Sequence, residues 1–135
     1  MLRPETRARA RALQLLYAAE VSGEEMDGVV RGLSRLTRSA EGLDEAEQLA
    51  SGVRADQARL DRLIADAADN WRLERIGVVE RNILRLGIHE MQRGTAAPKV
   101  VIDEAIRLGR WFGGPKAPAF VNGVLDRVAH TLGLL

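Results

Sequence analysis

Apolar residues recur at intervals of three or four along one long stretch of this chain, from Asp44 to about Asp69. Charged residues fill the rest of the helical circumference, so the stretch carries a single apolar stripe over roughly seven turns at 3.6 residues per turn. The members of this stripe are Leu49, Val53, Leu60, Ile64 and Ala67. This pattern excludes a half-buried β-strand, whose apolar residues would alternate, and it predicts one long amphipathic helix as the third helix of the chain.

The same spacing predicts further helices on both sides of the long one. They cover residues 5–23, 24–40, 78–94, 98–114 and 118–130, with a short helical turn in 70–77. The side chains expected to point inward in the longest of these are Leu13, Leu16, Tyr17, Val79, Ile83, Leu86, Met91, Val101, Ala105, Leu108, Phe112, Val121, Val124, Leu125, Val128 and Leu132. No stretch alternates apolar and polar residues over the length of a strand. The sequence therefore predicts an all-α fold of about seven helices.

Length and composition limit the domain organisation and the cell compartment. A chain of 135 residues that is 46% hydrophobic can bury one core, so we expect a single domain over 1–135, with helical halves at about 1–69 and 70–135. No apolar run approaches the roughly 18 residues that span a bilayer, and the N-terminus lacks an apolar signal segment. A cytoplasmic protein is expected. The absence of cysteine excludes disulfides and thiolate metal sites.

Residues suited to catalysis are scarce. His89 and Glu90 are adjacent and diverge by about 100° on a helix, so they cannot share a metal ion as two ligands four residues apart can. His130 has no second ligand at a suitable spacing, and the acidic pair Asp103 and Glu104 fits a solvated helix face. Neither a glycine-rich phosphate loop nor a nucleophile elbow occurs. The sequence predicts no enzyme, no metal site and no cofactor.

Positive charge gathers at the start of the chain, although the net charge is only +1. The first eleven residues contain Glu5 and four arginines, namely Arg3, Arg7, Arg9 and Arg11. Spacings of four and three place Arg7, Arg11 and Gln14 on one stripe, which either grips phosphates or is simply a solvated basic face. Lys116 stands just before the last helix, whose first N–H groups also suit an anion.

A glycine inside the last predicted helix calls for an explanation. Gly123 lies in "FVNGVLDRV", where glycine costs roughly 1 kcal/mol relative to alanine. Something must approach the backbone closely to compensate, either a neighbouring helix or a ligand. Of the two, we expect helix packing.

Four segments carry a resemblance to a known family. "ARARALQLLY" (8–17), "ERNILRLGIHEM" (80–91), "PKVVIDEAIRLGRWFG" (98–113) and "FVNGVLDRV" (120–128) are similar in order and spacing to the NusB family of bacterial antitermination factors. The resemblance implies two small packed helical bundles and no catalytic activity. It also implies binding to the boxA sequence of nascent ribosomal RNA transcripts, and pairing with NusE, a small-subunit ribosomal protein.

The resemblance also implies an RNA surface formed by the basic first helix and the start of the last helix. The RNA-binding residues that it predicts are Arg7, Arg9, Arg11, Gln14, Tyr17, Lys116, Phe120 and Asn122. Arginines pair with phosphates, aromatic rings stack on unpaired bases, and amides read base edges. Tyr17 and Phe120 could instead belong to the core, and Asn122 could bond to a neighbouring helix.

For NusE, the resemblance points to the C-terminal half of the chain. There, Glu74 and Glu80 offer acidic groups to a basic ribosomal protein, unless they pair with Arg75 and Arg81. The family includes monomers and homodimers, so a homodimer of this chain stays open.

Three other functions fit parts of the pattern. One is the NusB-like RNA-binding domain that is fused to RNA cytosine methyltransferases, although no S-adenosylmethionine domain follows Leu135. The second is a helix-turn-helix DNA regulator, for which no helix pair with a basic recognition helix stands out. The third is a helical protein–protein adaptor.

Overall fold

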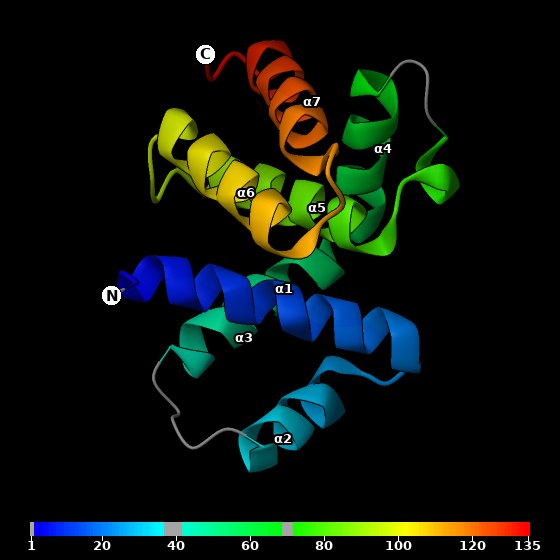
Figure 1. Cartoon of the computed structure of the whole chain (residues 1–135), viewed down its shortest axis with the longest axis vertical. Helices are drawn as coiled ribbons and strands as arrows, with labels where there is room; N and C mark the ends of the chain where they lie inside the picture. The colour runs from blue at the N-terminus through cyan, green and yellow to red at the C-terminus, as the bar shows by residue number, and fades with distance from the viewer. Residues whose placement is uncertain (1, 37–41, 69–71) are drawn as a thin grey trace. The chain divides into compact units, whose positions relative to one another are not determined.

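The structure is a computed structural model that describes residues 2–36, 42–68 and 72–135. In these ranges the chain forms seven α-helices, one 3-10 helix and no β-strand, which confirms the predicted all-α fold (Figure 1). The helices are α1 (Pro4–Ser22), α2 (Met26–Leu36), α3 (Leu43–Ala55), α4 (Gln57–Ala67), the 3-10 helix η1 (Leu73–Arg75), α5 (Val78–Arg93), α6 (Pro98–Phe112) and α7 (Ala117–Thr131). None of the described helices is long and apolar enough to cross a bilayer.

The chain divides into two compact units, Met1–Ala55 and Asp56–Leu135. The single domain over 1–135, with helical halves that meet near residue 69, stays a prediction.

The predicted long third helix is wrong, because it is interrupted at Asp56. This residue has φ −115° and ψ 14°, so α3 ends before it and α4 begins after it. Its carboxylate accepts a hydrogen bond from Nε of Arg59 at 2.9 Å, within the first turn of α4. Aspartate is favoured at helix N-termini, where its charge faces the positive end of the helix dipole. Apolar periodicity missed the break because each helix buries a stripe of its own. The predicted end of this helix at Asp69, like residues 37–40 of the second predicted helix, lies outside the described residues.

In the first unit, α1 packs against α3 and α2 (Figure 1). Pro4 occupies the first turn of α1, and Gly23 ends the helix with φ 74° and an N–H that donates to the Ala19 carbonyl. Small side chains are buried on both α1 and α3, where they leave room for close packing: Ala8, Ala12, Ala19, Ala46 and Ala50. Larger side chains complete this core: Leu13, Leu15, Leu16, Val29, Leu43 and Val53.

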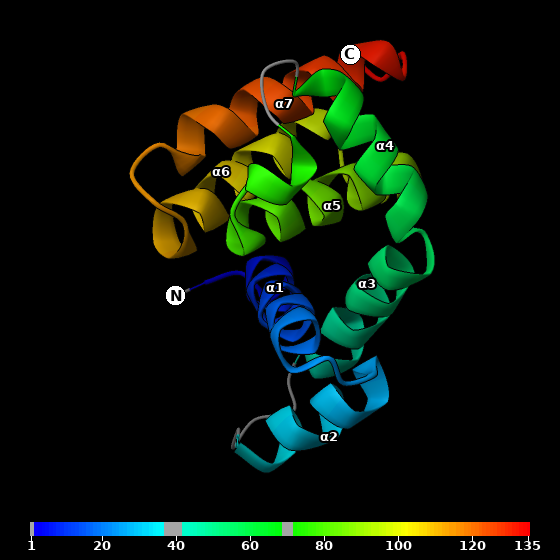
Figure 2. The ribbon, with the colours of Figure 1, turned by 90° about the vertical axis from the view of Figure 1, so that its right-hand side faces the viewer.

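In the second unit, α5 contacts α4, α6 and α7, and α7 in turn contacts α4 and α6 (Figure 2). Gly87 brings α5 close to α7, since a Cβ atom added there would lie 2.9 Å from Cδ1 of Leu125. The fully buried side chains around this crossing include Leu60, Ile64, Ile83, Leu84, Leu86, Ile88, Met91, Val101, Val121 and Leu125. The predicted apolar stripe of α7 is therefore confirmed for Val121, Val124, Leu125 and Val128.

Two aromatic side chains that were predicted to point inward are exposed instead. Tyr17 is 45% exposed, because the buried face of α1 is formed by other residues, among them Leu13 and Leu16, and does not extend to Tyr17. Phe112 is 41% exposed at the last residue of α6, where it meets Trp111 edge to face at a ring distance of 6.3 Å. The guanidinium of Arg107 lies 5.8 Å from the Trp111 ring centre. Periodicity alone gave too wide a stripe at both places.

Candidate nucleic-acid interface

The predicted RNA-binding residues of the first unit all lie on α1. Arg7 and Arg11 are half-buried and Gln14 is exposed, and their spacing places them on one face of the helix. Tyr17 lies at the edge of that face with nearly half of its surface open, which removes the alternative that it belongs to the core. This face of α1 combines cations, an amide and an aromatic ring.

Arg9 differs from the other arginines of α1. It follows Arg7 by two residues, which places it about 200° further round the helix, and it is only 7% exposed. A guanidinium so well covered cannot meet a phosphate without rearrangement. Its burial favours a structural role.

The predicted RNA-binding residues of the second unit lie where the chain enters α7. Lys116 precedes the helix at its N-cap position and is exposed, with its carbonyl accepting from the Phe120 N–H at 3.2 Å. Phe120 is half-buried, and Asn122 is exposed. The start of α7 thus offers a cation on Lys116, an aromatic ring on Phe120 and an amide on Asn122.

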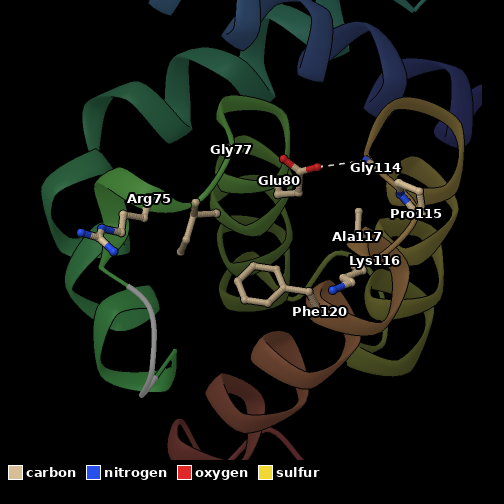
Figure 3. Close-up of a pocket in the computed structure, with 9 residues that line it drawn as sticks. Arg75, Gly77, Glu80, Gly114, Pro115, Lys116, Ala117 and Phe120 are labelled. Atoms are coloured by element: carbon tan, nitrogen blue, oxygen red, sulfur yellow. Dashed lines mark hydrogen bonds between the residues drawn. The ribbon is translucent and has the colours of Figure 1, made fainter.

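A pocket of about 540 Å³ opens beside Lys116 and Phe120 (Figure 3). It unites a predicted RNA-binding pair with Glu80, a predicted partner-binding residue. Its walls come from the end of η1, the first turn of α5, the α6–α7 loop and the start of α7. Sequence reasoning missed six of the lining residues, Arg75, Ile76, Gly77, Gly114, Pro115 and Ala117. The available signal was the glycine that stands shortly before each of two helix starts, Gly77 before α5 and Gly114 before α7. Glycine at such a place often marks a close approach of backbone.

Glu80 spans this pocket from α5 to the α6–α7 loop. Its Oε1 accepts a hydrogen bond from the Gly114 N–H at 3.1 Å, the dashed line in Figure 3. We call this contact the Glu80–Gly114 bridge. Glu80 also lies in the first turn of α5, where a carboxylate is stabilised by the helix dipole.

Glu74, the other predicted partner-binding residue, is exposed on η1. Arg81 binds the end of η1, because its guanidinium donates a hydrogen bond to the carbonyl of Ile76, the residue after η1, at 2.8 Å. The two predicted partner-binding residues therefore differ in setting: Glu74 is open to a partner, whereas Glu80 is engaged with the backbone of the α6–α7 loop.

The prediction that Gly123 serves helix packing is wrong. Gly123 is exposed, and beyond its chain neighbours and the backbone of its own helix, a Cβ atom added there would meet no atom of the described residues within 4 Å. The close approach of α7 to α5 occurs at Gly87 instead. Gly123 and its neighbour Asn122 present open backbone and an open amide on the outer side of α7.

The titratable residues considered for catalysis lie apart from this pocket. His130 is exposed, with Nδ1 2.8 Å from the Asp126 carbonyl. The Nε2 atom of His89 is buried without a hydrogen-bond partner among the described residues, and burial lowers the pKa of this imidazole. The expected solvated face holds for Asp103 only, because Glu104 is 3% exposed. Over the described ranges, no three possible metal ligands gather.

Comparison with known proteins covers nearly the whole chain. A model of the NusB family matches residues 6–130. The transcription antitermination protein NusB of Anaeromyxobacter dehalogenans is 46% identical, spanning 94% of this chain and 91% of that protein. The protein of the same name from Myxococcus xanthus is 39% identical, with 92% and 93% covered.

Two solved structures share the arrangement of helices. NusB of T. maritima has a TM-score of 0.85 at 30% identity and covers 96% of this chain and 93% of its own. A crystal structure of the antitermination factors NusB and NusE in complex with dsRNA has a TM-score of 0.84 at 26% identity, with 97% and 99% covered.

Proposed function

This chain belongs to the NusB family, and from that membership we propose that it is a transcription antitermination factor. It binds the boxA sequence of nascent ribosomal RNA transcripts together with NusE and so supports transcription of ribosomal RNA operons. The observation that carries the proposal is the likeness, over nearly the full length of both chains, to a NusB that was solved with NusE and RNA. We assign no catalytic step to the chain, and we place its action in the cytoplasm, where bacterial transcripts are made.

We propose that each unit contributes RNA contacts. In the first unit, Arg7 and Arg11 pair with phosphates, and Gln14 and Tyr17 contact bases. Support comes from their accessibility along one face of α1. Arg9 is the weakest of the predicted phosphate ligands because it is buried.

In the second unit, Lys116 pairs with a phosphate, Phe120 contacts a base and Asn122 reads a base edge. Lys116 and Asn122 are exposed, and Phe120 is half-buried at the pocket. Beside Asn122, Gly123 leaves open space through which an RNA strand can come close to the α7 backbone.

NusE binds the second unit in this proposal. Glu74 is the better placed of the two acidic candidates, because it is exposed and suits a basic partner. By thermodynamic linkage, NusE and RNA each strengthen the binding of the other. Replacing Glu74 by lysine should weaken NusE binding in a calorimetric titration while the helical content stays unchanged.

The deciding experiment is a titration of the protein with a boxA-type oligoribonucleotide at several salt concentrations. Competitors are a scrambled strand, duplex RNA and duplex DNA. We expect the boxA strand to bind best, and the loss of each phosphate contact in R7A, R11A or K116A to reduce the salt slope by roughly 0.7. R62A is the matched control, since Arg62 is an exposed arginine on α4 outside the proposed sites.

Other outcomes would overturn the proposal. Tightest binding to duplex DNA would favour a DNA regulator, and binding of NusE without any RNA affinity would favour an adaptor. Unchanged affinity and salt slope in all three variants would place the RNA on another face.

A further inference from the structure

Glu80 stands out among the pocket residues because its carboxylate joins segments 34 residues apart. We propose that Glu80 is a positioning residue: through the Glu80–Gly114 bridge it fixes the loop that carries Lys116 in the form that binds RNA. The inference rests on the proposed RNA-binding function. It gives Glu80 a role distinct from that of an acidic contact for a basic protein.

The hydrogen bonds around Gly114 connect the bridge to Lys116. The Gly114 N–H donates to Glu80, and its carbonyl accepts from the Ala117 N–H at 3.0 Å. Lys116 lies between these two anchored points, and its own carbonyl accepts the first hydrogen bond within α7. These hydrogen bonds connect the start of α5, at Glu80, with the start of α7, at Ala117, through Gly114. Lys116 lies within the connected segment.

Two glycines leave the room that the carboxylate occupies. A Cβ atom at Gly77 would collide with Oε2 of Glu80. One at Gly113 would lie 3.1 Å from Oε1 of Glu80 and 2.5 Å from Cβ of Ala117. The carboxylate therefore sits between two stretches of backbone that lack side chains, as Figure 3 shows for Gly77 and Gly114.

The bridge matters for binding because a fixed loop loses less conformational entropy when RNA arrives. The α6–α7 loop contains Gly113 and Gly114 in succession, which gives it unusual backbone freedom. An exposed lysine on such a loop would otherwise sample many positions. Holding Gly114 pre-organises Lys116 without any contact between Glu80 and RNA.

The test compares three variants: E80A, E80Q and G77A. E80A removes the acceptor. E80Q keeps an oxygen that can accept from the Gly114 N–H but loses the charge, so it separates the bridge from a charge effect. G77A leaves Glu80 in place and displaces its carboxylate, and since the colliding atom is the end of a flexible side chain, the fold should survive. D103A is the control for loss of an acid elsewhere in the unit, since Asp103 is exposed on α6 and belongs to neither proposed site.

Three measurements follow each variant: affinity for a boxA-type oligoribonucleotide, affinity for NusE, and hydrogen exchange of the Gly114 amide by NMR. We expect E80A and G77A to speed exchange at Gly114 and to weaken RNA binding by roughly three- to tenfold, and E80Q and D103A to match the wild type in both. In a K116A background, E80A should cause no further loss of RNA affinity.

The proposal fails if E80A leaves RNA affinity unchanged, if E80Q weakens RNA binding as much as E80A, or if the effects of E80A and K116A simply add. Failure of the proposed function would look different. The wild type would then bind no boxA-type RNA, and exchange at Gly114 would still report whether the bridge holds the loop.

Discussion

Arg85 and Asp61 form a two-pronged ion pair that fastens α5 to α4. Nε of Arg85 lies 2.7 Å from Oδ1 of Asp61, and the second guanidinium nitrogen lies 3.0 Å from Oδ2. Arg85 is 4% exposed, and a third hydrogen bond, at 3.1 Å, joins it to Oδ1 of Asn82. Burial of a charge is tolerated here because its donors are met in fork geometry.

Removing one partner of this pair should destabilise the second unit. R85A leaves the Asp61 carboxylate and the Asn82 amide without their main donor, so we expect a loss of about 3 kcal/mol in the free energy of unfolding. Chemical denaturation measures it. The double variant R85L/D61L should recover a large part of the loss, because it removes both charges together. If the double variant lost as much stability as the two single variants together, the Arg85–Asp61 pair would contribute no coupling energy.

Ile64 tests the core of the same unit. Its side chain is fully buried on α4, and I64A should cost roughly 2–5 kcal/mol through lost transfer energy and a residual cavity. Denaturant unfolding monitored by circular dichroism gives the value. The control is R62A: Arg62 is exposed on the same helix, and its replacement by alanine should change stability by under about 0.5 kcal/mol. A loss below that size for I64A would contradict the packing of α4.

Gly123 should be replaceable by alanine with a gain in stability. Outside the backbone of its own helix and its chain neighbours, the added methyl meets no described atom within 4 Å, and alanine is favoured over glycine in a helix by up to about 1 kcal/mol. Thermal unfolding should therefore shift upward in G123A. RNA affinity is measured on the same variant, and a loss there would place the RNA close to this backbone. As a contrast, G87A should destabilise the protein, because its methyl would press on Leu125.

Acid should destabilise the second unit through His89. Burial lowers the pKa of this imidazole below its ordinary value of 6.5, with the positive charge of Arg93 acting in the same direction and Asp56 opposing. Between the folded pKa and 6.5 the unfolded chain binds the proton more readily, so stability falls as the pH drops through this window. Unfolding measured at about pH 7.5 and about pH 5.5 shows the loss, which H89Q should reduce. H130Q, which replaces an exposed histidine, should leave it unchanged.

Periodicity was sufficient to predict the helices, because each buries one apolar stripe. It failed where the deciding feature was not apolar. The break at Asp56 depends on one backbone conformation and one carboxylate, and the exposure of Phe112 follows from its place at the end of α6. An apolar pattern contains neither piece of information.

The candidate site was predictable only by residue type. Family resemblance brought Lys116, Phe120 and Glu80 forward, but nothing in their sequence positions shows that they line one pocket. The role of Gly123 was misjudged because a glycine in a helix looks the same whether a helix or open space lies beside it. Only the packing of α5 against α7 identifies Gly87 as the tight point.

The exposed ring of Trp111 gives the chain a built-in optical reporter. It is one of two tryptophans and stands five residues before Lys116, under the guanidinium of Arg107. Its indole emission will respond to any change in local polarity or in the placement of that cation. With Trp71 replaced by phenylalanine, the fluorescence of a single indole would follow events at this end of α6 in real time, without a dye or a label.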